Sequence, residues 1–269
     1  MIQVESVAKQ YGEKVVLDDV DVTIAPGGIT ALVGANGAGK STLLAVMSRL
    51  LQADSGSVSV DGMDVGRTDS KRLARHLAIL RQENTLAVRL TVRDLVAFGR
   101  HPHSGGRLTI EDQRHIQQSL DYLNLGPLAD CFLDEISGGQ RQRAFVAMVL
   151  CQDTDYVLLD EPLNNLDMAH CVAILELLRR AADDLGKTIV IVLHDINAAS
   201  AYADHIIAMS EGRVIAEGAP SEIMVPRQLE QIFGVPVDVR DIDGQLVCLP
   251  FPTRRCCAGA CRCKEISVA

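Results

Sequence analysis

The motif GANGAGKST, at residues 34–42, says more about this chain than any other part of the sequence. It follows a short apolar run that is typical of a buried strand, and a helical pattern begins at Lys40. It matches G-x-x-x-x-G-K-[ST] in the strand–loop–helix context of a phosphate-binding loop. Glycine-rich backbone would direct N–H groups at phosphates, Lys40 would reach the β- and γ-phosphates, and Ser41 would offer its hydroxyl to Mg²⁺. The predicted nucleotide-binding residues here are Gly34, Ala35, Asn36, Gly37, Ala38, Gly39, Lys40, Ser41 and Thr42.

Two carboxylates follow another apolar run, VLLDEP at residues 157–162. In an open α/β sheet, ligands gather where parallel strands end, so these residues should lie beside the phosphate loop. We predict that Asp160 binds Mg²⁺ directly or through water. Glu161 is then the predicted base that polarises the attacking water. Without the phosphate loop, an acidic strand end exposed to solvent would explain the pattern equally well.

Gln82 and His194 also come at the ends of predicted strands. A histidine N–H at that edge can bind the γ-phosphate, and a glutamine amide can reach Mg²⁺ or the water. Each signal is weak by itself, because a lone histidine at a strand end is more often structural than catalytic. Because both residues follow predicted strands, as Asp160 and Glu161 do, we regard Gln82 and His194 as candidate catalytic residues.

The segment ISGGQ places Ser137, Gly138, Gly139 and Gln140 in front of an amphipathic helical pattern. Glycine lowers helix stability by about 1 kcal/mol relative to alanine in a helix interior, but at a helix start it permits close approach to the backbone. The N–H groups and dipole of a helix start favour an anion. The phosphate loop already binds the nucleotide from one side, so this second anion site suggests closure over the nucleotide of another subunit.

Strands and helices alternate along most of the chain, which predicts an α/β fold with a mostly parallel sheet covered on both faces. The N-terminal strands are expected to form an antiparallel β subdomain. Residues of about 85–150 are almost all helical in pattern, with capping boxes predicted at Thr91 and Thr109 and a Pro/Gly loop at residues 99–107. We therefore expect an inserted α-helical subdomain in a domain of residues 1–240, followed by an extension of residues 241–269.

The composition is that of a globular protein, with 48% hydrophobic and 23% charged residues and a formal net charge of -9. This charge argues against a nucleic-acid partner. No apolar run approaches the roughly 20 residues that a membrane-spanning helix needs. A membrane role is therefore expected to depend on a partner.

The eight cysteines fall into two groups. Four lie among apolar residues and are predicted to be buried thiols: Cys131, Cys151, Cys171 and Cys248. The other four crowd the segment RRCCAGACRCK: Cys256, Cys257, Cys261 and Cys263. Such a cluster can bind a soft metal, but it lacks paired CxxC spacing, so we expect a disordered tail with incidental thiols.

Taken in order, GANGAGKST, Gln82, ISGGQ, VLLDEP, Asp167 and His194 resemble an ATP-binding-cassette (ABC) ATPase subunit over roughly residues 2–240. The resemblance implies a P-loop NTPase core and a head-to-tail homodimer that encloses two ATP molecules with Mg²⁺. It implies that Tyr11 stacks on adenine and that Asn164-Asn165-Leu166-Asp167 forms the loop that crosses the dimer interface. Phosphate-loop kinases and small GTPases lack Ser-Gly-Gly-Gln and become remote alternatives.

Two departures from the family pattern are small. Ile136 stands where the family usually has leucine, and Asn164-Asn165 stands where many members have Ser-Ala or Ser-His. The second departure leaves the polarity of the dimer interface open.

The segments LTVRDLVAFGRHPH and LLDEPLNNLDM are similar to the branch that serves bacterial importers of ferric siderophores, haem and cobalamin. Ferric-siderophore members look most similar, and haem, cobalamin or another metal chelate is the alternative cargo. The branch implies an integral-membrane permease contacted by residues of about 83–103, and indirectly an extracytoplasmic siderophore-binding protein. The expected location is the cytoplasmic face of the cell membrane, as a peripheral subunit. The alternative to a transport subunit is a cassette protein with no transport role. Such proteins usually have two cassettes per chain, a long coiled-coil insertion or basic arms.

Overall fold

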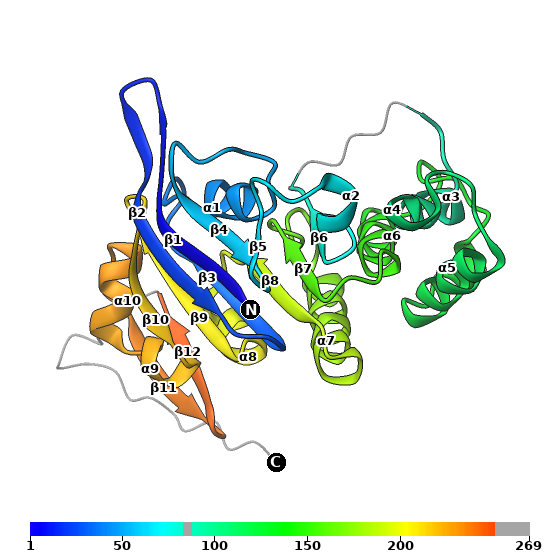
Figure 1. Ribbon diagram of the computed structural model, residues 1–269. Helices are drawn as coiled ribbons and strands as arrows, with labels where there is room; N and C mark the ends of the chain where they lie inside the picture. The colour runs from blue at the N-terminus through cyan, green and yellow to red at the C-terminus, as the bar shows by residue number, and fades with distance from the viewer. Residues whose placement is uncertain (83–87, 251–269) are drawn as a thin grey trace, which may run out of the picture.

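A six-stranded sheet forms the centre of the computed structural model, which describes residues 1–82 and 88–250 (Figure 1). The strand order is β10-β9-β3-β8-β7-β6, and only β10 runs antiparallel to its neighbour. The strands are β3 (Gly28–Val33), β6 (Leu77–Leu80), β7 (Tyr156–Leu159), β8 (Thr188–Val192), β9 (His205–Ser210) and β10 (Arg213–Gly218). Because the parallel strands end at one edge, the residues that follow β3, β6, β7 and β8 come together there.

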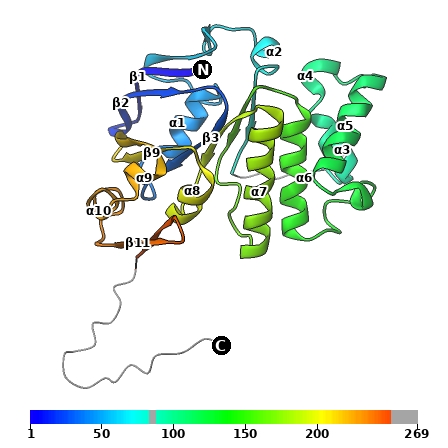
Figure 2. The ribbon, with the colours of Figure 1, turned by 90° about the horizontal axis from the view of Figure 1, so that it is seen from below.

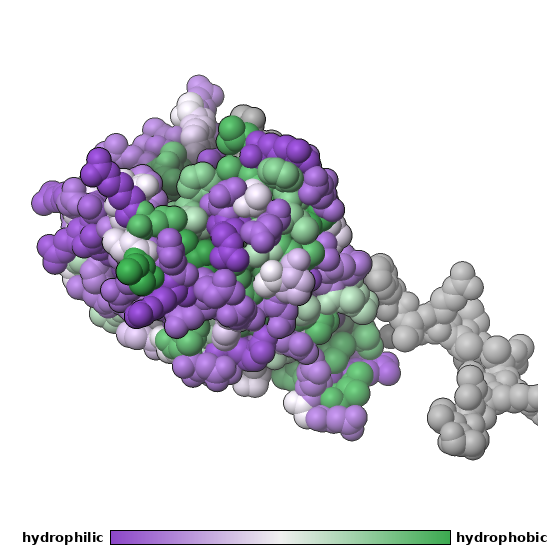
Figure 3. Space-filling view, turned by 90° about the vertical axis from the view of Figure 1, so that its right-hand side faces the viewer, coloured by the Kyte–Doolittle hydropathy of each residue, from purple (hydrophilic) through white to green (hydrophobic). Residues whose placement is uncertain are grey.

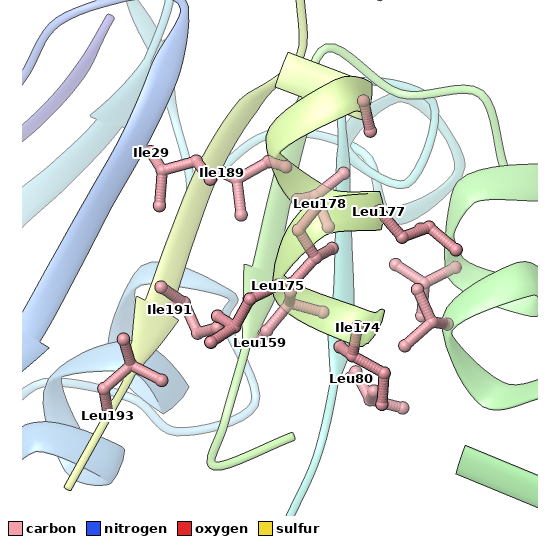
Figure 4. Packing of buried hydrophobic residues seen from close by; sticks show 14 of the residues in the cluster. Ile29, Leu80, Leu159, Ile174, Leu175, Leu177, Leu178, Ile189, Ile191 and Leu193 are labelled. Atoms are coloured by element: carbon pink, nitrogen blue, oxygen red, sulfur yellow. The ribbon is translucent and has the colours of Figure 1, made fainter. Parts of the chain in front are cut away.

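Alternate residues of these strands pack against different layers, as the two-residue period of a strand requires. Ile189 and Ile191 of β8 lie in the cluster with Leu175 and Leu178 of α7 (Met168–Leu185), as Figure 4 shows. Val190, between them, belongs to the cluster on the opposite face. Both faces are therefore covered, which explains why every residue of β8 is buried.

An antiparallel sheet covers one face of the main sheet, with the first helix packed between them (Figure 1). Its strand order is β2-β1-β4-β5. The elements are β1 (Ile2–Tyr11), β2 (Lys14–Ile24), β4 (Ser55–Val60), β5 (Met63–Asp64) and α1 (Lys40–Met47). Leu43, Leu44 and Met47 of α1 are fully buried in this cluster. The helix that follows the phosphate loop is thus held by both sheets.

The inserted subdomain is helical, as predicted, and lies beside β6 and β7 (Figure 1), with α6 (Gly138–Cys151) next to α7 (Figure 2). Its helices are α3 (Val92–Phe98), α4 (His101–Ser104), α5 (Ile110–Tyr122), a 3₁₀ turn at Gly126–Leu128 and α6, while the one-turn helix α2 (Ser70–Leu73) precedes β6. The capping boxes at Thr91 and Thr109 are confirmed. The loop predicted over residues 99–107 is partly wrong, because Pro102 in the first turn is compatible with the short helix α4. Figure 3 shows that the outer face of this side carries hydrophobic side chains among hydrophilic ones.

A buried ion pair fixes the helices of this subdomain. Nε of Arg100 donates to Oδ1 of Asp112 at 2.9 Å, and both side chains are 5% exposed. Arg100 also donates to the carbonyl oxygen of Cys151 at the end of α6. The pKa of Asp112 is lowered to about 2, first by its hydrogen bond from the backbone of Thr109 and then by Arg100, against the opposing effect of burial.

The C-terminal part adds a hairpin that packs against α8 (Ile196–Tyr202). The hairpin consists of β11 (Asp238–Ile242) and β12 (Gln245–Leu249). It is preceded by the helices α9 (Pro220–Ile223) and α10 (Pro226–Phe233). Asn197 of α8 exchanges two hydrogen bonds with the backbone of Cys248, and Ser200 donates to the carbonyl oxygen of Leu246. The boundary that we expected after residue 240 therefore falls inside β11, and the ordered fold continues beyond it.

The cysteine predictions are only partly confirmed. Cys151 and Cys248 are buried, whereas Cys131 and Cys171 are half-buried; all four are free thiols. Burial raises the pKa of Cys151 to about 11. The cluster from Cys256 to Cys263 lies outside the described residues.

Candidate active site

The phosphate loop occupies the turn between β3 and α1, where its conformation depends on glycine. Gly34 has a φ of 143°, and a Cβ atom there would come within 2.1 Å of the carbonyl oxygen of Met209. The loop tip at residues 35–37 is exposed, while Lys40 at the helix start is buried. Nζ of Lys40 donates to the carbonyl oxygens of Gly34 and Ala35, at 2.9 Å each. The loop thus offers an exposed tip with a cation beneath it, an arrangement that suits a polyphosphate.

Oxygen ligands for a divalent cation lie beside this loop. The hydroxyl of Ser41 donates to Oδ1 of Asp160 at 2.8 Å. Burial raises the pKa of Asp160, and the neighbouring Glu161 adds to that rise, against the hydrogen bond from Ser41. Burial also lowers the pKa of Lys40, against the charges of Glu161 and Asp160. A cation shared with phosphate oxygens would favour the ionised form of Asp160, which burial and the charge of Glu161 disfavour.

This set of ligands fits Mg²⁺ better than a metal held by protein alone. Mg²⁺ prefers oxygen ligands and is commonly bound through one or two carboxylates together with substrate phosphates. Within residues 1–82 and 88–250, no group of three or more His, Cys, Asp or Glu side chains could hold a metal ion. Ser41 and Asp160 would hold the ion on the protein side, as the sequence predicted.

The remaining predicted catalytic residues meet at the side chain of Glu161. The φ of Glu161 is 48°, an unusual backbone conformation for a residue with a side chain. Oε1 lies 2.8 Å from Nε2 of His194, and Oε2 accepts a hydrogen bond of 2.6 Å from Nε2 of Gln82. The three predicted catalytic residues are thus brought together, although they come from segments that follow β7, β6 and β8.

The structure adds a contact of Asn164, a residue that the family resemblance places in the loop crossing the dimer interface. Its amide Nδ2 donates to Oε2 of Glu161, beside the bond from Gln82. Only its position three residues after a predicted catalytic carboxylate could have indicated this contact.

The Ser-Gly-Gly-Gln segment forms the start of α6. Ser137 and Gln140 form a reciprocal capping box, in which each side chain accepts from the other's backbone N–H. Gly139 is buried against α7, and an added Cβ would lie 1.9 Å from Cδ2 of His170. Oδ1 of Asp167 in turn lies 2.7 Å from Nδ1 of His170. Hydrogen bonds to the backbone and side chain of His170 lower the pKa of Asp167.

Several predicted nucleotide contacts lie outside the cluster around Lys40 and Glu161. Tyr11 stands at the end of β1 with 54% exposure, and Nζ of Lys9 lies 5.7 Å from its ring centroid. In the described part of the chain, no hydrogen bond or ion pair joins the phosphate loop to Tyr11, Asp167 or residues 137–140.

Among the described residues, no helix is long and apolar enough to cross a membrane.

Comparison with known proteins identifies the family. The ABC transporter profile matches residues 17–164. The chain is 54% identical over 251 residues to the petrobactin import ATP-binding protein YclP of Bacillus subtilis (strain 168), covering 93% of this chain and 100% of that protein. It is 40% identical over 240 residues to the iron(3+)-hydroxamate import ATP-binding protein FhuC of the same organism, covering 88% and 89%.

Solved structures agree with this result. The cassette cbiO1 from Clostridium perfringens, part of the ABC transporter complex cbiONQ, aligns with a TM-score of 0.75 at 29% identity, covering 86% of this chain and 92% of that one. The dimeric structure of MJ0796, a bacterial ABC transporter cassette, aligns with a TM-score of 0.73 at 28% identity, covering 82% and 99%. The P-loop core, antiparallel β subdomain and helical insertion are those of this family. The chain therefore belongs to the ABC transporter family and is one of its ATP-binding, ATP-hydrolysing subunits.

Proposed function

We propose that this chain powers a bacterial importer that takes up ferric siderophore through a membrane permease. The 54% identity to a petrobactin import ATP-binding protein carries this proposal, because it extends over 93% of the chain. The similarity to an iron(3+)-hydroxamate import protein supports the same class of cargo. Haem, cobalamin and other metal chelates are tested as alternatives below.

Within the proposed reaction, the side chains that meet around Glu161 divide the work. Lys40 binds the phosphates, and Ser41 and Asp160 hold Mg²⁺, which neutralises phosphate charge when bound. Glu161 accepts a proton from the attacking water. His194 donates to the γ-phosphate, and Gln82 senses the ion or the water. The contact that supports this division is the meeting of Gln82 and His194 on the carboxylate of Glu161.

We propose a homodimer in which Ser137, Gly138, Gly139, Gln140 and Asp167 complete the nucleotide site of the partner. Ser137 and Gly138 are exposed at the start of α6, where backbone N–H groups and the helix dipole favour an anion. Tyr11 stacks on the adenine of its own chain, which its exposure at the end of β1 permits. The dimeric MJ0796 cassette supports this assembly by its similar fold.

The stretch of about residues 83–103, at the start of the helical subdomain, is the proposed permease-docking part. Val88 and Phe98 are 65% and 50% exposed, which supplies apolar surface within the described part of the expected docking stretch. Residues 83–87 of that stretch lie outside the described residues. Docking would place the subunit on the cytoplasmic face of the membrane, with an extracytoplasmic siderophore-binding protein delivering the cargo from the other side.

Uptake of radiolabelled iron in cells that lack the gene tests the proposal. Ferric siderophore, haem and labelled cobalamin are compared, with either the wild-type chain or Glu161→Gln restored. We expect wild type alone to restore siderophore uptake. Restoration of haem or cobalamin uptake instead would show that haem or cobalamin, and not ferric siderophore, is the cargo. Normal uptake of all three in the deletion strain would contradict the proposal that this chain powers their import.

A further inference from the structure

The carboxylate of Glu161 is held by three side chains from three separate segments. Gln82 and Asn164 both donate to Oε2, while His194 contacts Oε1. The Glu161 side chain is only 10% exposed, so protein contacts rather than water set its direction. The orientation of the proposed base therefore depends on these three partners.

Two of the partners have other tasks in the proposed reaction. His194 is assigned to the γ-phosphate, and Gln82 is assigned to Mg²⁺ or the attacking water. Nε2 of His194 cannot donate to the γ-phosphate while it is directed at Glu161. Gln82 would bind Mg²⁺ through its amide oxygen, and it keeps its N–H on Oε2 only where both contacts fit one orientation of the amide. Asn164 has no ligand assigned in the site of its own chain, although the family resemblance places its loop at the dimer interface. Its bond to Oε2 can therefore persist when His194 and Gln82 turn toward their ligands.

The backbone around Asn164 is suited to hold the amide in place. The N–H of Asn164 donates to the carbonyl oxygen of Glu161 at 3.3 Å, which closes a turn between the two residues. Leu163 and Leu166, on either side, pack against the hydrophobic core. The N–H of Leu166 donates to the carbonyl oxygen of Leu163 at 3.3 Å. The amide is thus presented to Glu161 from a loop anchored at both ends.

We propose that Asn164 is a positioning residue for ATP hydrolysis, which holds Oε2 of Glu161 so that Oε1 stays directed at the attacking water. The inference rests on the proposed role of Glu161 as the base. During the step, the proton of water moves to Oε1 while the amide of Asn164 remains bound to Oε2. Asn164 therefore acts through Glu161 and contacts neither the water nor the phosphate.

The test compares Asn164→Asp with wild type, because the substitution keeps the shape of the side chain but replaces the donor by a carboxylate oxygen. ATP hydrolysis is measured with the subunit assembled on its permease. We expect kcat to fall by about tenfold or more, as the loss of a hydrogen bond to a charged group implies. The KM for ATP and ATP-dependent dimer formation should stay near wild type. Asn164→Leu provides a second variant, without added charge, and should also lower kcat alone.

Asn165→Asp is the matched control, since it adds the same charge one residue along the chain and should lower kcat less. Unchanged kcat in both Asn164 variants would overturn the proposal. A change in KM or in dimer formation that accounts for the lost activity would also overturn it, because Asn164 would then act at the dimer interface.

A double variant separates this inference from the function on which it rests. In the Glu161→Gln background, Asn164→Leu should not slow single-turnover hydrolysis further, because residues that act through one group are not additive. A further loss would show that Asn164 acts independently of Glu161. Near-normal hydrolysis by Glu161→Gln alone would instead remove Glu161 from its proposed role.

Discussion

The adjacent glycines at the start of α6 should respond in opposite ways to the same substitution. At Gly139 an added Cβ would lie 1.9 Å from Cδ2 and 2.4 Å from Cγ of His170, whereas at Gly138 it would meet nothing within 4 Å. Ordinary van der Waals contact begins at about 3.4 Å, so Gly139→Ala requires a displacement of roughly 1.5 Å. The His170 ring cannot yield freely, because Nδ1 lies 2.7 Å from Oδ1 of Asp167.

The expected cost can be estimated from the effect of overpacking. Adding a methyl group to a well-packed site typically costs about 1–3 kcal/mol. Gly138→Ala should instead gain up to about 1 kcal/mol, because alanine favours the helix. In a chain of roughly this size, 1 kcal/mol changes Tm by about 2–4 °C. We therefore expect Gly139→Ala to lower Tm by roughly 2–12 °C and Gly138→Ala to raise it slightly.

Thermal unfolding of the purified subunit without nucleotide measures these effects apart from ligand binding. The double variant Gly139→Ala/His170→Ala should recover more than half of the Tm lost by Gly139→Ala, because the shorter side chain leaves room for the methyl group. Equal Tm changes at the two glycines would refute the steric argument. So would a double variant in which the two losses simply add.

Three further outcomes follow from the site and the helical subdomain. Glu161→Gln should bind ATP and dimerise, yet kcat should fall by at least about 100-fold, measured as phosphate release; near-normal turnover would exclude it as the base. Lys40→Ala should weaken ATP binding by roughly tenfold or more in calorimetry, because the phosphates lose a charged donor; an unchanged affinity would contradict this assignment. Asp112→Asn should lower the free energy of unfolding near pH 7 by about 3–5 kcal/mol, since it leaves Arg100 buried without its charged partner. Because the pKa of Asp112 is lowered to about 2, its ionisation stabilises the fold above about pH 4, and this contribution of about 2 kcal/mol is lost as the pH falls toward 2. The stability gap between wild type and Asp112→Asn in urea unfolding should therefore narrow over that range, and a constant gap would refute the linkage.

Local signals in the sequence predicted the parts of the fold that depend on neighbouring residues. The phosphate loop, the capping boxes at Thr91 and Thr109 and the long helix α7 all have such signals, because caps, glycines and helical periodicity act within a few residues. The meeting of Gln82 and His194 at Glu161 was also foreseeable, because it follows from the shared edge of parallel strands.

Features that depend on distant segments were missed or only partly predicted. The bonds between Asn197 and Cys248 join residues 51 positions apart, and no local pattern indicates them. The contact of Asn164 with Glu161 spans only three residues, but Glu161 has a φ of 48°, an unusual backbone conformation that a side-chain pattern does not encode. Half-burial of Cys131 and Cys171 likewise depends on how helices and loops finally pack.

The attachment of β12 to α8 also affects how the protein can be engineered. Asn197, which binds the backbone of Cys248, lies three residues after His194. A reporter or affinity domain fused directly after residue 250 would therefore be attached to a strand that is hydrogen-bonded to α8. This helix begins two residues after His194, the proposed γ-phosphate contact. Fusion partners intended to leave turnover undisturbed are better separated from β12 by a flexible glycine- and serine-rich linker.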